Sequence, residues 1–216
     1  MMLPIGMQAQ KPTLNELQFV PLWGEIELKL GEPLPADEDS LVIEKLRFYI
    51  SKAALLRNGK TVWADAEQVW LIDAGVPGAT KIKLNVSDSF EFDTLVFYAG
   101  IDSATNCSGA MQGALDAEKG MYWTWQSGYI HTKLEARGRL NHELLLHLGG
   151  YRQPYNTLRL VKLPIAGNAN KLLVEVNLKP LVEAARRMNT SKVMQPGKLA
   201  SDLSDVWGNC FKTTVK

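Results

Sequence analysis

The stretch EKGMYWTWQSGYIHTKLE, residues 118–135, holds the densest group of aromatic side chains in the chain. Four large rings fall within eight of its residues, and a glycine marks the turn on either side. If residues 121–127 are extended, alternate side chains point to opposite faces, which puts Trp123 and Trp125 on the same face. The pattern therefore predicts two stacked indole rings on one face of a strand.

Gly128 decides how this face continues, because a glycine within a strand can introduce a bulge that shifts the alternation. Without a bulge, Tyr129, His131 and Lys133 lie on the same side as the two indoles. The sequence then predicts an imidazole on the tryptophan side of the strand.

Short strand-like segments make up most of the remaining chain, either alternating between apolar and polar residues or rich in branched and aromatic ones. The segment at 14–30 is expected to be an edge strand or a bulged hairpin, because Pro21 and Gly24 interrupt it. Asn58-Gly59 is typical of a tight hairpin turn. The further strands are expected at 41–51, 53–56, 69–72, 81–86, 94–100, 143–148, 157–163 and 171–178.

Helical periodicity is found only near the end, at 179–188, where Pro180 suits a first helical turn, and at 199–207, which Gly208 ends. Many short strands followed by these segments predict a mainly β fold, an antiparallel β-sandwich with one or two short C-terminal helices. Residues 11–216 are expected to form a single domain.

Charge and hydropathy exclude several classes of protein. The chain has 24 lysines and arginines against 23 aspartates and glutamates, so no net field favours a nucleic acid or a membrane surface, and we expect no nucleic-acid partner. No apolar run approaches the ~20 residues that a membrane helix needs. The start MMLPIGMQAQ, residues 1–10, is typical of the end of a secretory signal; an ordinary disordered start is the alternative.

Two cysteines, Cys107 and Cys210, stand in turn-like contexts. In an exported protein they are expected to pair as a disulfide, because the compartment is oxidising. Two separate reduced thiols are the alternative.

The three histidines, His131, His142 and His147, are the candidates for a metal site. His142 and His147 are an odd number of residues apart, so they face opposite ways on one uninterrupted strand. His131 and His147 on neighbouring strands are the workable pair of ligands. The alternative for each is an ordinary packed or surface histidine.

The loop expected at 102–120 is rich in glycine, and long ordered loops are often functional. Asp102, Asn106 and Asp116 offer the oxygen ligands that a hard cation such as Ca²⁺ prefers, and capping of turns is the alternative role. No GxSxG, HExxH, GxGxxG or phosphate-loop motif occurs, so we expect no enzyme.

Intact tryptophan has one N–H donor and no lone pair for a metal. Its ring-opened oxidation product, kynurenine, carries an aniline nitrogen that suits a soft cation such as Cu(I) beside imidazoles. The alternative for Trp123 and Trp125 is that they are core rings of the sandwich.

Five segments, in this order along most of the chain, resemble the periplasmic MbnP-like family, whose namesake accompanies the methanobactin copper-chelator system. They are LRFYIS (46–51), WLID (70–73), AGIDSATNCSGAMQGALD (99–116), GMYWTWQSGYIHTKLE (120–135) and HLGGYRQPYN (147–156). The resemblance implies an exported β-rich protein, periplasmic or secreted, with association with an outer membrane as an alternative. It also implies a MauG-like dihaem peroxidase partner that oxidises a tryptophan to kynurenine, and Cu(I) held by histidines and kynurenine.

Carried over by position, Trp125 and Trp123 match the family's aromatic block, and His147 matches its HxGGY histidine. Other positions depart from the pattern. Trp70 stands where many members have histidine, as do Pro21 and Leu22 in the first strand, so two candidate copper ligands are missing. Asparagine is common where His131 stands. Lesser differences fall at Ala117, where proline is common, and Ala136, where glycine is.

Three hypotheses follow from the residues and the resemblance. The first is a copper-binding protein with Trp125 or Trp123 modified by a partner oxidase, and His147 and His131 as ligands. The second is a structural or partner-binding module without metal. The third is a protein substrate or electron donor of a dihaem peroxidase.

Overall fold

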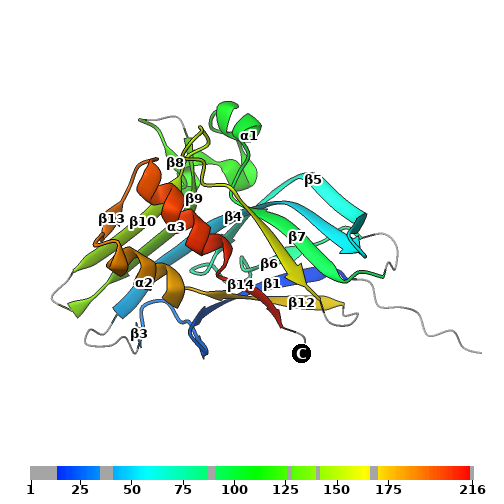
Figure 1. The fold of residues 1–216 in the computed structure, drawn as a ribbon, viewed down its shortest axis with the longest axis horizontal. Coiled ribbons are helices and arrows are strands. Elements are labelled where there is room, and N and C mark those ends of the chain that lie inside the picture. The colour runs from blue at the N-terminus through cyan, green and yellow to red at the C-terminus, as the bar shows by residue number, and fades with distance from the viewer. Residues whose placement is uncertain are drawn as a thin grey trace, which may run out of the picture.

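The computed structural model of the chain describes residues 14–34, 41–86, 91–125, 128–139, 142–165 and 170–214. Its strands form two curled sheets that pack face to face, with α2 (Lys179–Arg187) and α3 (Lys198–Gly208) beside them (Figure 1). The sandwich with C-terminal helices is confirmed. The predicted signal remnant at 1–10 lies outside the described residues. Within the described residues, no helix has the length and apolar character needed to cross a membrane.

The smaller sheet has the strand order β14-β12-β1-β2, with β6 also pairing β1. Its strands are β1 (Glu16–Trp23), β2 (Ile26–Glu27), β6 (Lys81–Lys83), β12 (Lys171–Asn177) and β14 (Phe211–Thr214). Of the two alternatives for the first segment, the edge strand is not found, because β1 runs between β12 and its partners β2 and β6. The predicted hairpin is present at Gly24, whose φ is 64°.

The larger sheet has the order β11-β7-β4-β9-β10-β13, with β3 and β5 pairing β4 and β8 pairing β9. Its strands are β3 (Pro33–Leu34), β4 (Leu41–Arg57), β5 (Lys60–Asp73), β7 (Thr94–Ala99), β8 (Tyr122–Trp123), β9 (Gly128–Arg137), β10 (Glu143–Gly149), β11 (Arg159–Pro164) and β13 (Lys192–Val193). Two pairings, β1 with β12 and β10 with β13, are parallel, so the sandwich is not wholly antiparallel as predicted.

Strand β4 is the centre of the larger sheet. The two strands predicted at 41–51 and 53–56 are one strand, which bends at Lys52, where φ is 51° and the pairing register shifts. The predicted Asn58-Gly59 turn joins β4 to β5 with positive φ at both residues, 49° and 76°. This is the geometry of the tight hairpin turn whose twist matches that of the strands.

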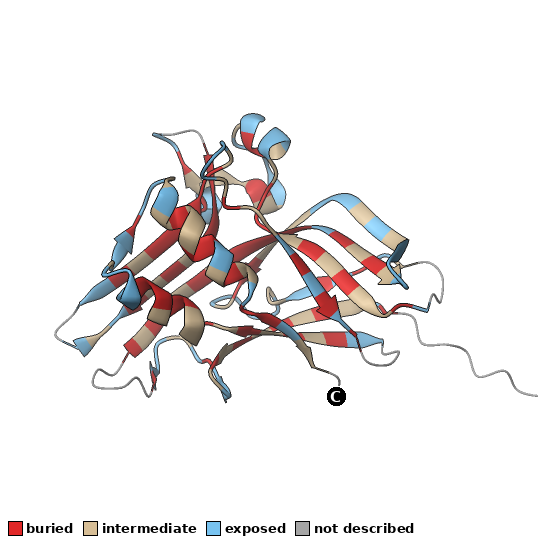
Figure 2. Cartoon of the chain, viewed as in Figure 1, coloured by how far each residue is buried: buried red, intermediate tan, exposed pale blue. Residues whose placement is uncertain are grey.

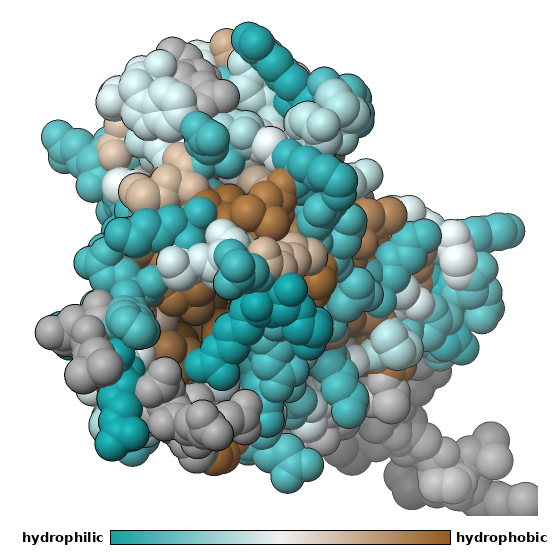
Figure 3. Space-filling view, turned by 60° about the vertical axis from the view of Figure 1, so that its left-hand side comes forward, coloured by the Kyte–Doolittle hydropathy of each residue, from teal (hydrophilic) through white to brown (hydrophobic). Residues whose placement is uncertain are grey.

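The main core lies between the two sheets, where buried residues face inward from both (Figure 2). Edge-to-face aromatic pairs fill its centre, with Trp207 of α3 4.8 Å from Phe211 and 5.2 Å from Phe48 between ring centroids. Truncation of such a buried ring to alanine typically costs about 3–5 kcal/mol. Packing against this core is therefore what fixes α3 on the sandwich. The space-filling view shows an apolar area in the middle of one face, bordered by hydrophilic side chains (Figure 3).

A second, smaller core lies on the other face of the larger sheet. Strand alternation sends Phe48 into the main core and its neighbour Tyr49 into the second. The segment that covers this face was predicted as a loop and contains three short helices, α1 (Ser103–Cys107), η1 (Gly113–Leu115) and η2 (Ala117–Lys119). The aromatic stretch of β8 and β9 packs beneath it, at the top of the molecule in Figure 1.

Candidate functional site

The two indoles of the aromatic stretch lie together, with ring centroids 6.1 Å apart and planes tilted by 49°. The prediction of one extended segment over 121–127 is wrong, because β8 ends at Trp123 and a turn begins at Thr124. The turn, rather than strand alternation, brings the rings together, which is why they are tilted instead of stacked. Trp125 is 65 % exposed, whereas Trp123 is only 7 % exposed.

Across the hairpin, Tyr122 pairs with Tyr129 and Trp123 pairs with Gly128. Directly opposed residues share a face, and the rings of Tyr122 and Tyr129 are 4.9 Å apart. The prediction that Tyr129 lies on the indole face is therefore wrong. Gly128 leaves the position opposite Trp123 without a side chain.

Trp123 packs directly onto Gly149 in β10. A Cβ atom at Gly149 would lie 2.7 Å from the Cζ3 atom of Trp123 and 2.5 Å from the carbonyl oxygen of Tyr129. Both distances are too short for any side chain, so the seat of the indole requires glycine. This explains the first glycine of the HLGGY segment in physical terms.

Two buried tyrosines hold the covering segment in place. The Tyr129 hydroxyl lies 2.7 Å from the Leu115 carbonyl oxygen and accepts the Met111 N–H at 3.1 Å. The Tyr49 hydroxyl donates to the Ala114 carbonyl at 3.1 Å. Burial raises the pKa of both phenols above the ordinary tyrosine value, so both remain protonated donors.

His131 is fully enclosed by its neighbours. Its Nε2 atom lies 3.2 Å from the Asn106 side-chain nitrogen, and its Nδ1 atom lies 3.0 Å from the Thr157 hydroxyl. Since an amide nitrogen can only donate, Nε2 is the acceptor and Nδ1 carries the proton. Burial lowers the pKa of His131 to about 4, so the ring is neutral at pH 7. Both ring nitrogens are used within the protein.

His147 belongs to a separate cluster of charges on the outer face of the sheet. Its Nε2 atom lies 2.9 Å from Glu135, which also contacts Lys45 at 2.7 Å and Lys133 at 3.6 Å. Burial, with the nearby Lys133 charge, lowers the pKa of His147, so Nε2–H donates to the carboxylate. Burial alone would raise the pKa of Glu135, but hydrogen bonds from Lys45 and His147 bring it below its ordinary value.

These contacts show how well the two histidines, in their encoded surroundings, suit a copper ion. Cu(I) prefers soft thiolate and thioether ligands together with free imidazole nitrogens. His131 has both nitrogens occupied, and His147 directs Nε2 to a carboxylate. Within the described ranges, no group of three or more His, Cys, Asp and Glu residues could hold a metal ion. As encoded, these contacts do not fit a copper centre, and His131 with His147 as a pair of copper ligands stays a prediction.

The three candidate calcium ligands have structural roles instead of a common centre. Asp102 caps α1 through the Thr105 N–H at 2.8 Å and contacts Lys52 at 2.6 Å. Although burial acts to raise it, these two partners lower the pKa of Asp102 to about 2. Asn106 is buried beside His131, and Asp116 caps η2 through the Glu118 N–H at 2.9 Å. Calcium binding stays a prediction that the arrangement does not favour.

The cysteines are separate free thiols, so the predicted disulfide is not formed. Cys107 is exposed in α1. Cys210 is buried just after α3, with its sulfur 3.4 Å from the Val206 carbonyl oxygen, and burial raises its pKa to about 12. Cys107 lies in α1, over the second core, and Cys210 lies in the main core, so the two residues belong to different layers of the fold.

The structure also reveals a pocket of about 170 Å³ beside the indole pair that the sequence did not indicate. Aromatic residues and glycines supply much of its lining, and one arginine contributes a charge. It is lined by Trp123, Gly128, Tyr129, Gly150, Tyr151, Arg152, Gln153, Tyr155, Pro196 and Gly197. The only sequence signal for it was the segment HLGGYRQPYN, which carried a family resemblance and no chemical role.

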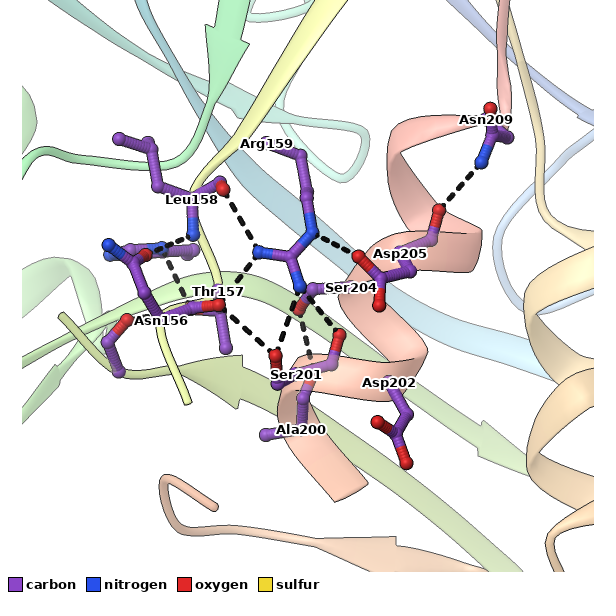
Figure 4. A network of polar contacts seen from close by, with 12 residues as sticks. Asn156, Thr157, Leu158, Arg159, Ala200, Ser201, Asp202, Ser204, Asp205 and Asn209 are labelled. Carbon is purple, nitrogen blue, oxygen red and sulfur yellow. Dashed lines mark hydrogen bonds and ion pairs between the residues drawn. The ribbon is translucent and has the colours of Figure 1, made fainter. Parts of the chain in front are cut away.

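Arg159 fixes the segment that forms one wall of this pocket (Figure 4). Its guanidinium donates to the Asn156 carbonyl at 2.7 Å, to Asp205 at 2.6 Å and to the Ser201 carbonyl at 2.9 Å. Asp205 and Ser201 belong to α3, so one side chain ties the start of β11 to that helix. The nearby Thr157 is held separately, by its hydroxyl contacts with His131 at 3.0 Å and the Gly150 carbonyl oxygen at 3.1 Å.

Comparisons with known proteins agree with this architecture. The sequence model of the MbnP family matches residues 12–198. Among solved structures, MbnP from Methylosinus trichosporium is similar, with a TM-score of 0.56 and 16 % identity over 78 % of this chain and 77 % of that chain. At this identity the likeness is one of fold. A search of curated proteins gave no match.

Proposed function

Since the chain belongs to the MbnP family, we propose that it is an exported protein substrate of an oxidising partner, with the pair Trp125 and Trp123 as the site of modification. The observation that supports this is the exposure of Trp125, 65 %, directly beside Trp123 at 6.1 Å. An exposed indole offers a partner a large ring to contact, and tryptophan is enriched among the residues that anchor binding partners. The chain itself is then not an enzyme but the molecule acted upon.

The proposed partner is a dihaem peroxidase that uses hydrogen peroxide. Two peroxide molecules deliver two oxygen atoms across the C2–C3 bond of the indole and leave as water, which gives N-formylkynurenine. Hydrolysis then releases formic acid and leaves kynurenine, a net gain of about 4 Da on the tryptophan. This chemistry needs an indole edge that a partner can approach, which Trp125 offers and Trp123 does not.

Trp123 has a different role in this proposal. Its ring is held by Gly149 below and contacts Trp125 at its side. When the partner removes an electron from Trp125, an indole radical cation forms, and a fixed neighbouring indole can share it. We therefore assign Trp125 as the residue that is converted and Trp123 as its redox neighbour.

Copper binding is proposed only for the oxidised protein. The described side chains do not converge on a copper centre before oxidation, and intact indole has no lone pair to offer. Kynurenine would add an aniline nitrogen that the encoded chain lacks. A titration of both forms against a Cu(I) chelator, with His147→Ala beside the wild type, tests this directly.

The main experiment is co-expression with a MauG-like dihaem peroxidase, followed by peptide mass spectrometry. We expect a gain of about 4 Da, or about 32 Da for the formyl intermediate, on the peptide that holds Trp125. Trp125→Phe should abolish the gain. Trp63→Phe, which alters an indole on β5 far along the chain, is the matched control and should retain it.

Two outcomes would count against the proposal. Unmodified protein after co-expression with an active peroxidase would leave the exposed indole as an anchor for a binding partner, since tryptophan is enriched among such anchors. Oxidation spread evenly over all the tryptophans would show unspecific damage instead of a directed reaction.

A further inference from the structure

The pocket beside Trp123 has the features of a small-molecule site. It lies between the β8–β9 hairpin, the segment after β10 and the segment before α3, so three separate parts of the chain form its walls. We propose that it binds a small aromatic carboxylate, with one ring between the aromatic side chains and the carboxylate at Arg152. This inference does not depend on oxidation of either tryptophan, because the pocket is formed by the encoded residues.

The volume limits the ligand to a single ring. Pockets for drug-sized ligands are typically about 300–1,000 Å³, whereas this one is about 170 Å³. A cavity of roughly 150 Å³ suffices for benzene. A six-membered ring therefore fits, with a short polar substituent reaching toward the opening.

The lining favours an aromatic ring over an aliphatic chain. Trp123, Tyr151 and Tyr155 bring three π-systems to the pocket, and aromatic rings prefer edge-to-face or offset contacts with one another. At one edge of the pocket the backbone of Gly150 packs closely on the opposite wall, where a Cβ would lie 3.1 Å from Pro196 and 3.1 Å from the carbonyl oxygen of Tyr155. The walls are thus already packed against each other, and the space between them is preformed.

The charge at the pocket favours an anion. The Arg152 guanidinium carbon lies 5.4 Å from the centroid of the Tyr151 ring, which orients it by a cation–π contact. Within the part of the chain that the structure describes, no carboxylate forms an ion pair with Arg152. A guanidinium is well suited to two-point recognition of a carboxylate.

The start of α3 adds a positive electrostatic field, of the same sign as the charge of Arg152. Gly197 lines the pocket and is the residue before the helix, and no side chain caps that end. The positive end of a helix stabilises a nearby negative charge. By comparison, the wider hollow of about 610 Å³ over β1 and β12 is lined mainly by polar and charged side chains of both signs, which offer no aromatic enclosure.

Calorimetric titration of the purified protein with benzoate, benzamide and acetate tests the proposal. Benzoate and benzamide have nearly the same shape, so their difference measures the charge, and acetate measures the contribution of the ring. We expect saturable benzoate binding with a Kd on the order of 1 mM or tighter, as its few heavy atoms allow. Benzamide should bind about tenfold more weakly, and acetate should not saturate.

Variants locate the site. Arg152→Gln should weaken benzoate binding by about tenfold and leave benzamide unchanged, and Tyr155→Ala should weaken both. Arg187→Gln, an exposed arginine of α2, is the control and should bind like the wild type. Equal affinity for benzoate and benzamide, an unaltered Arg152→Gln variant, or no saturable binding of either aromatic compound would overturn the proposal.

Discussion

The side chain of Asn106 joins α1 to β9 by holding His131 and the backbone of Tyr129 at the same time. Its nitrogen lies 3.2 Å from His131 Nε2, and its oxygen accepts the Tyr129 N–H at 2.9 Å. The chain of contacts continues from His131 through the Thr157 hydroxyl to the Gly150 carbonyl oxygen. The covering segment, the aromatic hairpin and the pocket wall therefore share one buried polar network.

The first prediction concerns stability in acid. His131 has a folded pKa of about 4, below the ordinary value of 6.5, because burial disfavours the charged ring. Between these two pH values the unfolded chain binds more protons than the folded one. The contribution of His131 to the free energy of unfolding is therefore fully present above pH 6.5 and is lost as the pH falls toward 4. The loss attributable to His131 is about 3 kcal/mol, measured by denaturant unfolding at a series of pH values.

His131→Asn tests the assignment, because asparagine is uncharged over this range. The variant should lose most of the slope between pH 6.5 and 4, and a smaller slope from His147, whose pKa is also lowered, should remain. His142→Asn, which alters an exposed histidine directly before β10, is the control for a histidine substitution as such. An unchanged slope in His131→Asn would refute the assignment.

The second prediction concerns Asn106 itself. Asn106→Leu keeps a similar volume but leaves His131 Nε2 and the Tyr129 N–H without partners in a buried place. Each orphaned group costs about 1–3 kcal/mol, so a total loss of several kcal/mol is expected in urea unfolding. The exposed Asn85→Leu should change stability by less than about 0.5 kcal/mol. A similarly small effect at Asn106 would mean that water replaces its contacts.

The third prediction concerns the seat of Trp123. Gly149→Ala places a methyl group 2.7 Å from the indole and 2.5 Å from a backbone oxygen, and such overpacking typically costs about 1–3 kcal/mol. The displaced ring should also change the tryptophan emission spectrum. Gly138→Ala is the matched control, since its nearest contact would be an ordinary 3.7 Å. Equal stability of the two variants would contradict the structure at this point.

The fourth prediction contrasts two buried threonines. The Thr132 hydroxyl has no hydrogen-bond partner among the described residues, whereas the Thr157 hydroxyl contacts both His131 and Gly150. Thr132→Val should therefore be neutral or stabilise the protein by about 1 kcal/mol, and Thr157→Val should destabilise it by about 1–3 kcal/mol. Thermal unfolding of the two variants gives the comparison, and destabilisation by Thr132→Val would indicate an ordered water at that site.

Local patterns in the sequence predicted several elements well. The Asn58-Gly59 turn, the helices near 179–188 and 199–207, and strands such as β7 and β12 were found from turn chemistry and periodicity alone. Shorter pieces escaped notice: β13 has two residues and β14 has four, too few to show a period. The length of β4 was also missed, because a bend at Lys52 has the sequence appearance of a break.

The candidate site was predicted in part. The sequence singled out Trp123 and Trp125, and the structure places them together, although by a turn instead of by strand alternation. The contacts of the predicted metal ligands could not be read from the sequence, because spacing along strands shows which residues share a face of the sheet but not which side chains they contact. Neither the enclosure of His131 nor the Glu135 contact of His147 has any local signature.

By itself, the sequence determined what depends on neighbours along the chain: the strand and helix periods, the tight turns, the balanced charge and the aromatic density of residues 118–135. The tertiary structure alone decided what depends on residues far apart. It placed β1 inside its sheet, enclosed His131 between Asn106 and Thr157, and formed a pocket from three separate segments. The physical reason is that burial and pairing arise only when distant segments pack together, so no local pattern encodes which side chains are left exposed.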